Sequence, residues 1–210
     1  MFLATTVYAQ GAACGDPFNN GSNGPFDYRT SRAHLARVVE PHHFTTNVEL
    51  MRGGASTNVI GSDIAYTLRV SPNHHRALTT MGQWSLRTKS NPPKGSVYTV
   101  ECWFDRAIRF RADDAMVKVI YGNYLIKSGK AEKAIAQFQA AIGDAGEDAN
   151  VYYNLGLAYI ELKKYDLALE NAHMAYRLGF PLPGLKNRLQ RAGAWREAPV
   201  GSAEIPQMRE

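Results

Sequence analysis

Residues 149–176 read ANVYYNLGLAYIELKKYDLALENAHMAY, and this stretch decides the fold. Two runs with helical spacing flank Lys163-Lys164, where we expect a turn. One face of the first run carries Tyr152, Leu155, Gly156 and Tyr159, and the second run carries Ala168, Ala172 and Ala175. Small residues are required where two antiparallel helices cross closely, and large apolar residues are required where hairpins stack. The stretch therefore predicts a helical hairpin.

The same pattern recurs along the chain at an interval of 34 residues. Ala107, Ala141 and Ala175 share this interval. The other matched pairs are Phe104 with Phe138, Tyr121 with Leu155, Gly122 with Gly156, and Ala134 with Ala168. In the preceding window, YGNYLIKSGKAEKAIAQFQAAI, Gly129 stands at the turn, where glycine adopts a left-handed backbone most easily. We therefore expect two consecutive hairpins, 115–148 and 149–182, with Gly122 and Gly156 at the close crossings.

These two repeats resemble the tetratricopeptide repeat (TPR) family, whose pattern places Leu-Gly and then Tyr in the first helix and spaced alanines in the second. Upstream, Met81-Gly82 stands where Leu-Gly belongs in a further repeat, 75–114, with its second helix at VECWFDRAIRF. An insertion, SNPPKGS, lengthens that repeat, because its prolines and glycine cannot continue a helix. The resemblance implies an all-α fold, an antiparallel helix-hairpin solenoid of about three repeats.

Both ends of the helical domain, which we place at 61–192, depart from the repeat. SDIAYTLRV resembles the second helix of a degenerate half repeat, with Ser62 as its N-cap. Pro181 and Pro183 end the last full repeat, and residues 184–192 predict an amphipathic helix that caps the stack. Residues 193–210 are expected to form a flexible tail.

Residues 10–60 fit no repeat and are rich in Gly, Asn and Pro, so we expect an irregular N-terminal arm with helical turns near 32–39 and 46–52. The strings CGDPFNNGSNGPFDYR, PHHFT, PNHHRAL, LGFPLPGLKNRL and AGAW occur along the chain. Together they resemble a group of exported proteobacterial TPR proteins of unsettled function. That resemblance covers nearly the whole chain and implies no assigned activity.

The N-terminus and the cysteines bear on the compartment. Residues 1–9, MFLATTVYA, resemble the remnant of a signal peptide cleaved after Ala9, although a disordered N-terminus is the alternative. The two cysteines, Cys14 and Cys102, have no metal-ligand spacing and form one disulfide if the protein is exported. In a cytosolic protein they would be two free thiols. We expect a periplasmic or secreted protein.

Size and charge exclude several classes of function. The 210 residues carry a net charge of +5 that is spread along the chain, without a basic patch or a nucleic-acid-binding motif. No segment approaches the roughly 18 apolar residues of a membrane-spanning helix. We expect neither nucleic-acid binding nor membrane insertion.

Histidine is the residue type to test for chemistry, because imidazoles are the commonest metal ligands. The pairs are His42-His43 and His74-His75. Adjacent residues point in different directions, so a site would need one histidine from each pair, with Asp63 or Glu49. The competing interpretation is structural or capping histidines. Haem, zinc, nucleotide and catalytic-serine motifs are all absent from the sequence, so we expect no cofactor and no enzyme activity.

The positive hypothesis is a scaffold that binds a peptide or protein on the concave face lined by first helices. The expected contact residues are Lys118, Asn123, Lys127, Tyr153, Asn154, Leu157 and Glu161. The two asparagines would bond a ligand backbone, Tyr153 would anchor it, and the lysines would favour an acidic ligand. Three alternatives stay open: an ordinary solvated face, a groove filled by the N-terminal arm, and self-assembly into a homo-oligomer through that arm.

Overall fold

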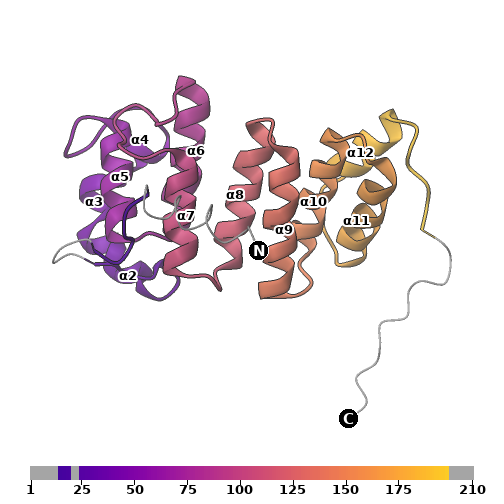
Figure 1. The fold of residues 1–210 in the computed structure, drawn as a ribbon, viewed down its shortest axis with the longest axis horizontal. Helices are drawn as coiled ribbons and strands as arrows, with labels where there is room; N and C mark the ends of the chain where they lie inside the picture. Colours follow the sequence, from indigo (N-terminus) through magenta and orange to yellow (C-terminus); the bar gives the residue numbers. More distant parts are fainter. Residues whose placement is uncertain (1–13, 20–23, 199–210) are drawn as a thin grey trace, which may run out of the picture. The chain divides into compact units, whose positions relative to one another are not determined.

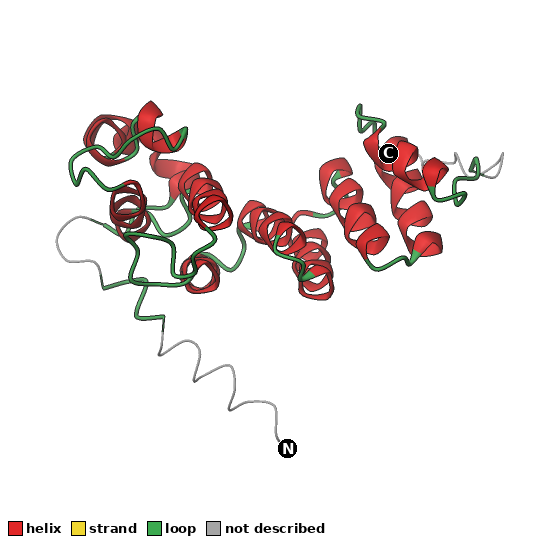
Figure 2. Ribbon diagram, turned by 90° about the horizontal axis from the view of Figure 1, so that it is seen from above, coloured by secondary structure: helices red, strands yellow, loops and turns green. Residues whose placement is uncertain are grey.

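The structure is a computed structural model that describes residues 14–19 and 24–198. Within these ranges the chain forms helices α2 to α12 and no strand (Figures 1 and 2). None of these helices combines the length and apolarity that crossing a bilayer requires. The chain divides into two compact units, Met1–Gly146 and Glu147–Glu210, and each is described by itself.

The first unit contains eight of the described helices. They are α2 (Tyr28–Val38), α3 (Glu40–His43), α4 (Thr46–Glu49), α5 (Ile60–Val70), α6 (His75–Thr88), α7 (Val100–Phe110), α8 (Ala115–Lys127) and α9 (Ala131–Ala145). Neighbours along the chain from α5 to α9 pack together, and α6 also packs against α8. This is the arrangement of stacked hairpins in which the first helices of two repeats lie side by side.

The hairpin of α8 and α9 forms as the sequence predicts. Gly129 in its turn has φ +74°, the left-handed conformation that favours glycine. Gly122 lies at the close crossing, because a β-carbon there would stand 2.6 Å from the ring of Phe138 on α9. Phe138 is fully buried, so the glycine is what allows the two helices to approach.

The hairpin of α6 and α7 carries the expected insertion. Residues 89–99 contain no helix, and they begin at Lys89, whose φ of +51° ends α6. The side chain of Thr99 then caps α7 by accepting a hydrogen bond from the Cys102 backbone N–H.

Two details upstream of α6 differ from the sequence expectation. Helix α5 begins at Ile60, so Ser62 is not its N-cap; the Ser62 hydroxyl instead donates to the carbonyl oxygen of Gly95 in the 89–99 loop. Helix α2 is also longer than the expected helical turn. It begins at Tyr28 because the Asp27 carboxylate accepts from the Arg29 N–H and caps the helix.

The second unit holds α10 (Ala149–Glu161), α11 (Tyr165–Arg177) and α12 (Gly184–Arg191). The turn between the first two falls at the expected lysines, with Lys163 at φ +57°. A β-carbon on Gly156 would stand 2.6 Å from Leu185 of α12 and 3.3 Å from the Ala168 carbonyl oxygen of α11. Gly156 therefore lets α12 lie against the hairpin of α10 and α11.

Residues after α12 contact the helices as far as Glu197, within the range where the sequence predicts a flexible tail. The Trp195 ring packs edge-on against His173, at 5.2 Å between centroids, and the Lys186 ammonium lies 4.6 Å from its centre. The His173 ring also bonds to the Arg196 carbonyl oxygen. Residues 199–210 and the expected signal-peptide remnant, 1–9, lie outside the described residues.

Candidate functional site

A small hollow lies between α6 and α8 in the first unit. Its deepest residues are apolar or aromatic: Leu78, Gly82, Phe104 and Tyr124. Its sides are formed by Thr79, Gln83 and Leu86 from α6 and by Ile120, Asn123 and Lys127 from α8. The hollow has a volume of about 40 Å³. It can therefore receive one side chain of a bound segment but no drug-sized ligand, since pockets for those measure about 300–1,000 Å³.

Glycine and an aromatic side chain together shape the floor. A β-carbon on Gly82 would come within 3.1 Å of the Tyr124 ring, so glycine allows that ring to lie against α6. The Phe104 ring lies 6.2 Å from the Tyr124 ring and nearly parallel to it. Burial, together with the carboxylate of Glu101, raises the pKa of Tyr124 and keeps its phenol neutral. The floor is thus uncharged.

The rim carries polar groups that are available to a ligand. Within residues 14–19 and 24–198, the side chains of Gln83, Asn123 and Lys127 form no hydrogen bond or ion pair with the rest of the chain. Gln83 and Lys127 are exposed, and Asn123 is half-buried at the hollow. Each amide can both donate to and accept from an extended backbone. Asn123 and Lys127 are two of the residues that the sequence analysis selected.

Helices α6 and α8 contain no Asp or Glu, whereas α7 and α9 each contain two acidic residues. Not all of the basic residues on α6 and α8 are available. Arg76 is paired with Glu40 and Glu49, and the Arg87 guanidinium donates to a backbone carbonyl. Lys127 is therefore the free positive charge at the rim of the hollow.

Lys118 does not occupy the exposed position that the sequence analysis gave it. It is buried, its ammonium donates to the Ala112 carbonyl oxygen at 2.7 Å, and it forms an ion pair with Asp144 of α9. Its position on α8 turns it toward the second helix of its own hairpin. Lys118 therefore serves the fold and offers no charge to a ligand.

The other expected contact residues lie in the second unit, where most have partners within the unit. The Tyr153 ring stacks on Phe180, at 4.0 Å between centroids. The Asn154 amide donates to the Asn150 backbone and side chain. Glu161 is exposed and forms an ion pair with Arg188 of α12 at 2.8 Å, and Leu157 is half-buried. The Asn154 contacts lie within α10, and the Glu161 ion pair joins α10 to α12.

None of the contact residues expected from the sequence lies on the α6 side of the hollow. Gln83 follows Gly82 in the chain as Asn123 follows Gly122 and Leu157 follows Gly156. That repeated place after the glycine was the available signal. Gly82 was placed in this register, but the expected contact residues were selected only from the two repeats that follow.

Three histidines pair with carboxylates, and the pairs of His43 and His74 hold the N-terminal arm. The His43 ring bonds to Asp63 at 2.9 Å, and the His75 ring bonds to Asp114 at 2.9 Å. His74 accepts from the Ala77 N–H through Nδ1 and bonds to Glu40 through Nε2, and burial lowers its pKa despite that carboxylate. His42 is exposed. In the described part of the chain, no group of three or more His, Cys, Asp or Glu is placed to hold a metal.

The strings GPFDYR and PNHHRAL meet in one polar network. The Asn73 amide donates to both Asp27 and Asp114 at 2.8 Å, and its oxygen accepts from the Tyr28 N–H. Hydrogen bonds from Arg29, followed by those from Asn73 and Arg111, hold the pKa of Asp27 well below its usual range despite partial burial. This network therefore joins α2 to the start of α6. Its residues do not line the hollow.

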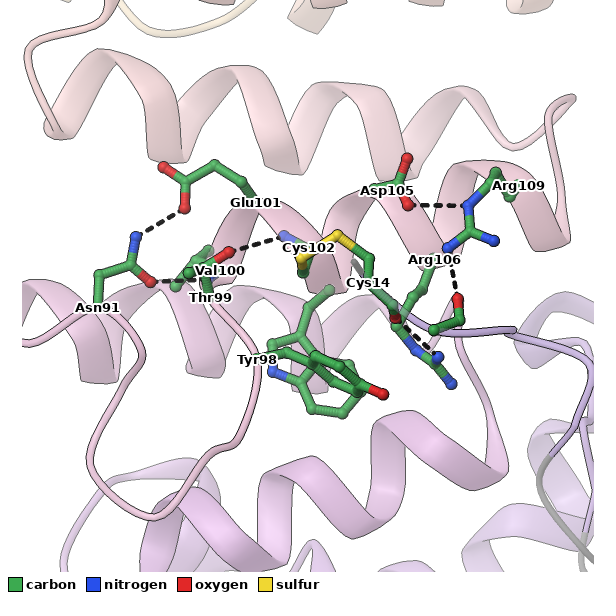
Figure 3. Close-up of a disulfide and its surroundings, with 12 residues drawn as sticks. Cys14, Asn91, Tyr98, Thr99, Val100, Glu101, Cys102, Asp105, Arg106 and Arg109 are labelled. Atoms are coloured by element: carbon green, nitrogen blue, oxygen red, sulfur yellow. Dashed lines mark hydrogen bonds and ion pairs between the residues drawn. A yellow bond between two sulfur atoms is a disulfide. The ribbon is translucent and has the colours of Figure 1, made fainter. Parts of the chain in front are cut away.

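A disulfide joins Cys14 to Cys102 on α7, with a Cα–Cα distance of 5.0 Å (Figure 3). The guanidinium of Arg106 donates to the carbonyl oxygens of Cys14 and Asp16, and Arg109 donates to that of Gly15. The alternative of two free thiols is therefore wrong. A structural disulfide is consistent with an exported protein.

Residues 14–19 of the arm lie on α7 and leave the hollow open. Phe18 packs against Phe110 of α7, with ring centroids 5.6 Å apart, and none of residues 14–19 lines the hollow. For this segment, the alternative in which the arm fills its own groove is wrong.

A known structure shares this architecture. The chain superposes on PilF of Pseudomonas aeruginosa, a TPR protein, with a TM-score of 0.51 and 18% sequence identity, covering 90% of this chain and 71% of that one. No protein-family model matches the chain, and neither does any curated protein. At this identity the likeness concerns the fold alone, and the chain has a TPR-like all-helical fold of antiparallel hairpins.

Proposed function

We propose that this protein is a non-catalytic scaffold of the bacterial cell envelope that binds an extended acidic segment of a partner protein between α6 and α8. The observation that carries the proposal is the hollow with an apolar floor and a free polar rim. The TPR-like fold supports a role in protein interaction. The disulfide and the resemblance to exported proteins support the compartment.

The chemistry of the hollow specifies the kind of ligand. An extended segment presents backbone N–H and carbonyl groups, which the amides of Gln83 and Asn123 can satisfy. One apolar side chain of the segment would enter the hollow over Gly82. An acidic neighbour would pair with Lys127, and the absence of acidic residues on both helices removes repulsion of a negative ligand.

The test compares a triple variant with a double variant, each used in a pull-down from envelope extract of the native host. The first, Gln83→Ala/Asn123→Ala/Lys127→Glu, removes the rim. The control, Lys133→Glu/Gln139→Ala, changes exposed residues of the same types on α9. Partners retained by the wild type and the control should be lost from the rim variant, because central contacts of this kind contribute about 2 kcal/mol or more each.

Two outcomes would contradict the proposal. Equal retention by both variants would place the binding surface elsewhere. Concentration-dependent growth in light scattering of the purified protein, with no retained partner, would favour self-assembly over the scaffold.

A further inference from the structure

The loop between α6 and α7 presents an apolar side chain to solvent in a fixed conformation. Val97 in this loop is 76% exposed, the most of any large apolar residue in the described ranges. Hydrogen bonds hold the loop at the two residues Lys94 and Gly95, just before the tip. The Trp84 indole donates to the Lys94 carbonyl at 3.1 Å, and the Ser62 hydroxyl donates to the Gly95 carbonyl at 2.9 Å. The exposure of Val97 therefore does not result from a loose loop.

Two further exposed apolar residues lie on segments that contact this loop or the end of α6. Val59, at the start of α5, is 40% exposed and adjoins Gly95. Leu50, at the end of α4, is 46% exposed, and the next residue, Met51, accepts a hydrogen bond from Arg87. All three apolar side chains stand in a loop or at a helix end, outside any regular face on which a partner helix could lie.

All charged residues within segments 50–62 and 84–100 are positive, since these segments contain no Asp or Glu. The flanking carboxylates of Glu49 and Glu101 are paired with Arg76 and Lys130. Arg52, Lys89 and Lys94 are exposed, and within residues 14–19 and 24–198 none of them forms an ion pair. We call the set Leu50, Arg52, Val59, Lys89, Lys94 and Val97 the basic loop surface.

We propose that the basic loop surface binds the surface of an anionic lipid bilayer. Apolar side chains on projecting loops can enter the boundary between headgroups and acyl chains, while flanking cations attract lipid phosphates. A flat, negatively charged partner can contact three separate apolar side chains and the cations between them at the same time. A helix or an extended segment would need these groups to lie along one line. The surface is separate from the hollow, since it shares no residue with it.

The experiment is co-sedimentation of the full chain with vesicles. One set contains phosphatidylcholine alone, and the other replaces one lipid in three with phosphatidylglycerol. The wild type should bind only the second set, and binding should weaken as salt is added. Removing two cations in Lys89→Gln/Lys94→Gln should weaken binding about 30-fold, which corresponds to about 1 kcal/mol for each cation near the bilayer. Val97→Asp should weaken it as well.

Two controls separate this proposal from others. Leu182→Asp/Lys163→Gln/Lys164→Gln removes an exposed apolar residue and two exposed lysines of the second unit, and it should bind as the wild type does. Gln83→Ala/Asn123→Ala, in the hollow, should also leave vesicle binding unchanged. Circular dichroism verifies that each variant is folded. Sedimentation with neither vesicle, equal binding to both, or equal loss in the loop and second-unit variants would overturn the proposal.

Discussion

Substituting Gly122 by alanine tests whether close helix crossing stabilises the fold. The new β-carbon would stand 2.6 Å from the Phe138 ring, which is fully buried and cannot move into solvent. Overpacking of this kind costs about 1–3 kcal/mol, while replacing glycine inside a helix returns up to about 1 kcal/mol. We expect Gly122→Ala to lower the free energy of unfolding of the first unit by up to about 2 kcal/mol.

Gly143 provides a matched control on the partner helix. It lies in α9, is exposed, and a β-carbon there would meet nothing within 4 Å. Gly143→Ala should therefore raise stability, by up to about 1 kcal/mol from helix propensity. Urea unfolding followed by far-ultraviolet circular dichroism and by tryptophan fluorescence measures both variants. Equal effects of the two substitutions would refute the close crossing at Gly122.

Three further predictions concern the first unit. Cys14→Ser/Cys102→Ser should lower its stability by about 4–5 kcal/mol in the chain-entropy model for a separation of 88 residues, measured by thermal unfolding with and without reductant. Asp144→Leu leaves the buried Lys118 ammonium without its ion-pair partner and should cost about 1–3 kcal/mol, and Lys118→Met/Asp144→Leu should cost less than the two single changes together. Because burial lowers the pKa of His74, the folded state resists protonation, so stability should fall as pH drops below about 6.5. His74→Asn keeps the cap on Ala77 and should flatten that dependence in urea titrations between neutral and mildly acidic pH.

The hairpins could be predicted from sequence because their information is local. Helices α8 and α10 begin at Ala115 and Ala149, which are the first residues of the two predicted 34-residue repeats. Gly122 and Gly129 each fulfil the physical role that their residue type required. A period with small residues at helix crossings constrains the backbone before any tertiary contact is known.

The structure of the arm and of the site could not be predicted in the same way, because it depends on contacts between residues that are distant in the sequence. Asp27 caps α2 and also bonds to Asn73, 46 residues away, and nothing in the local sequence shows that partner. Lys118 was placed on an exposed face by helical spacing, but Asp144 on the neighbouring helix draws it inward. Trp195 looked like part of a tail because its partners, His173 and Lys186, lie on two other helices.

Site-specific photo-crosslinking in the native host tests the scaffold function most directly. A photoreactive residue replaces Gln83 at the rim of the hollow or, as the control, Gln139 on α9, since both are exposed glutamines of the first unit. We expect one discrete crosslinked partner from position 83, with an acidic segment at the site of attachment, and no such product from position 139. The same partner from both positions, or a partner from position 139 alone, would contradict binding between α6 and α8.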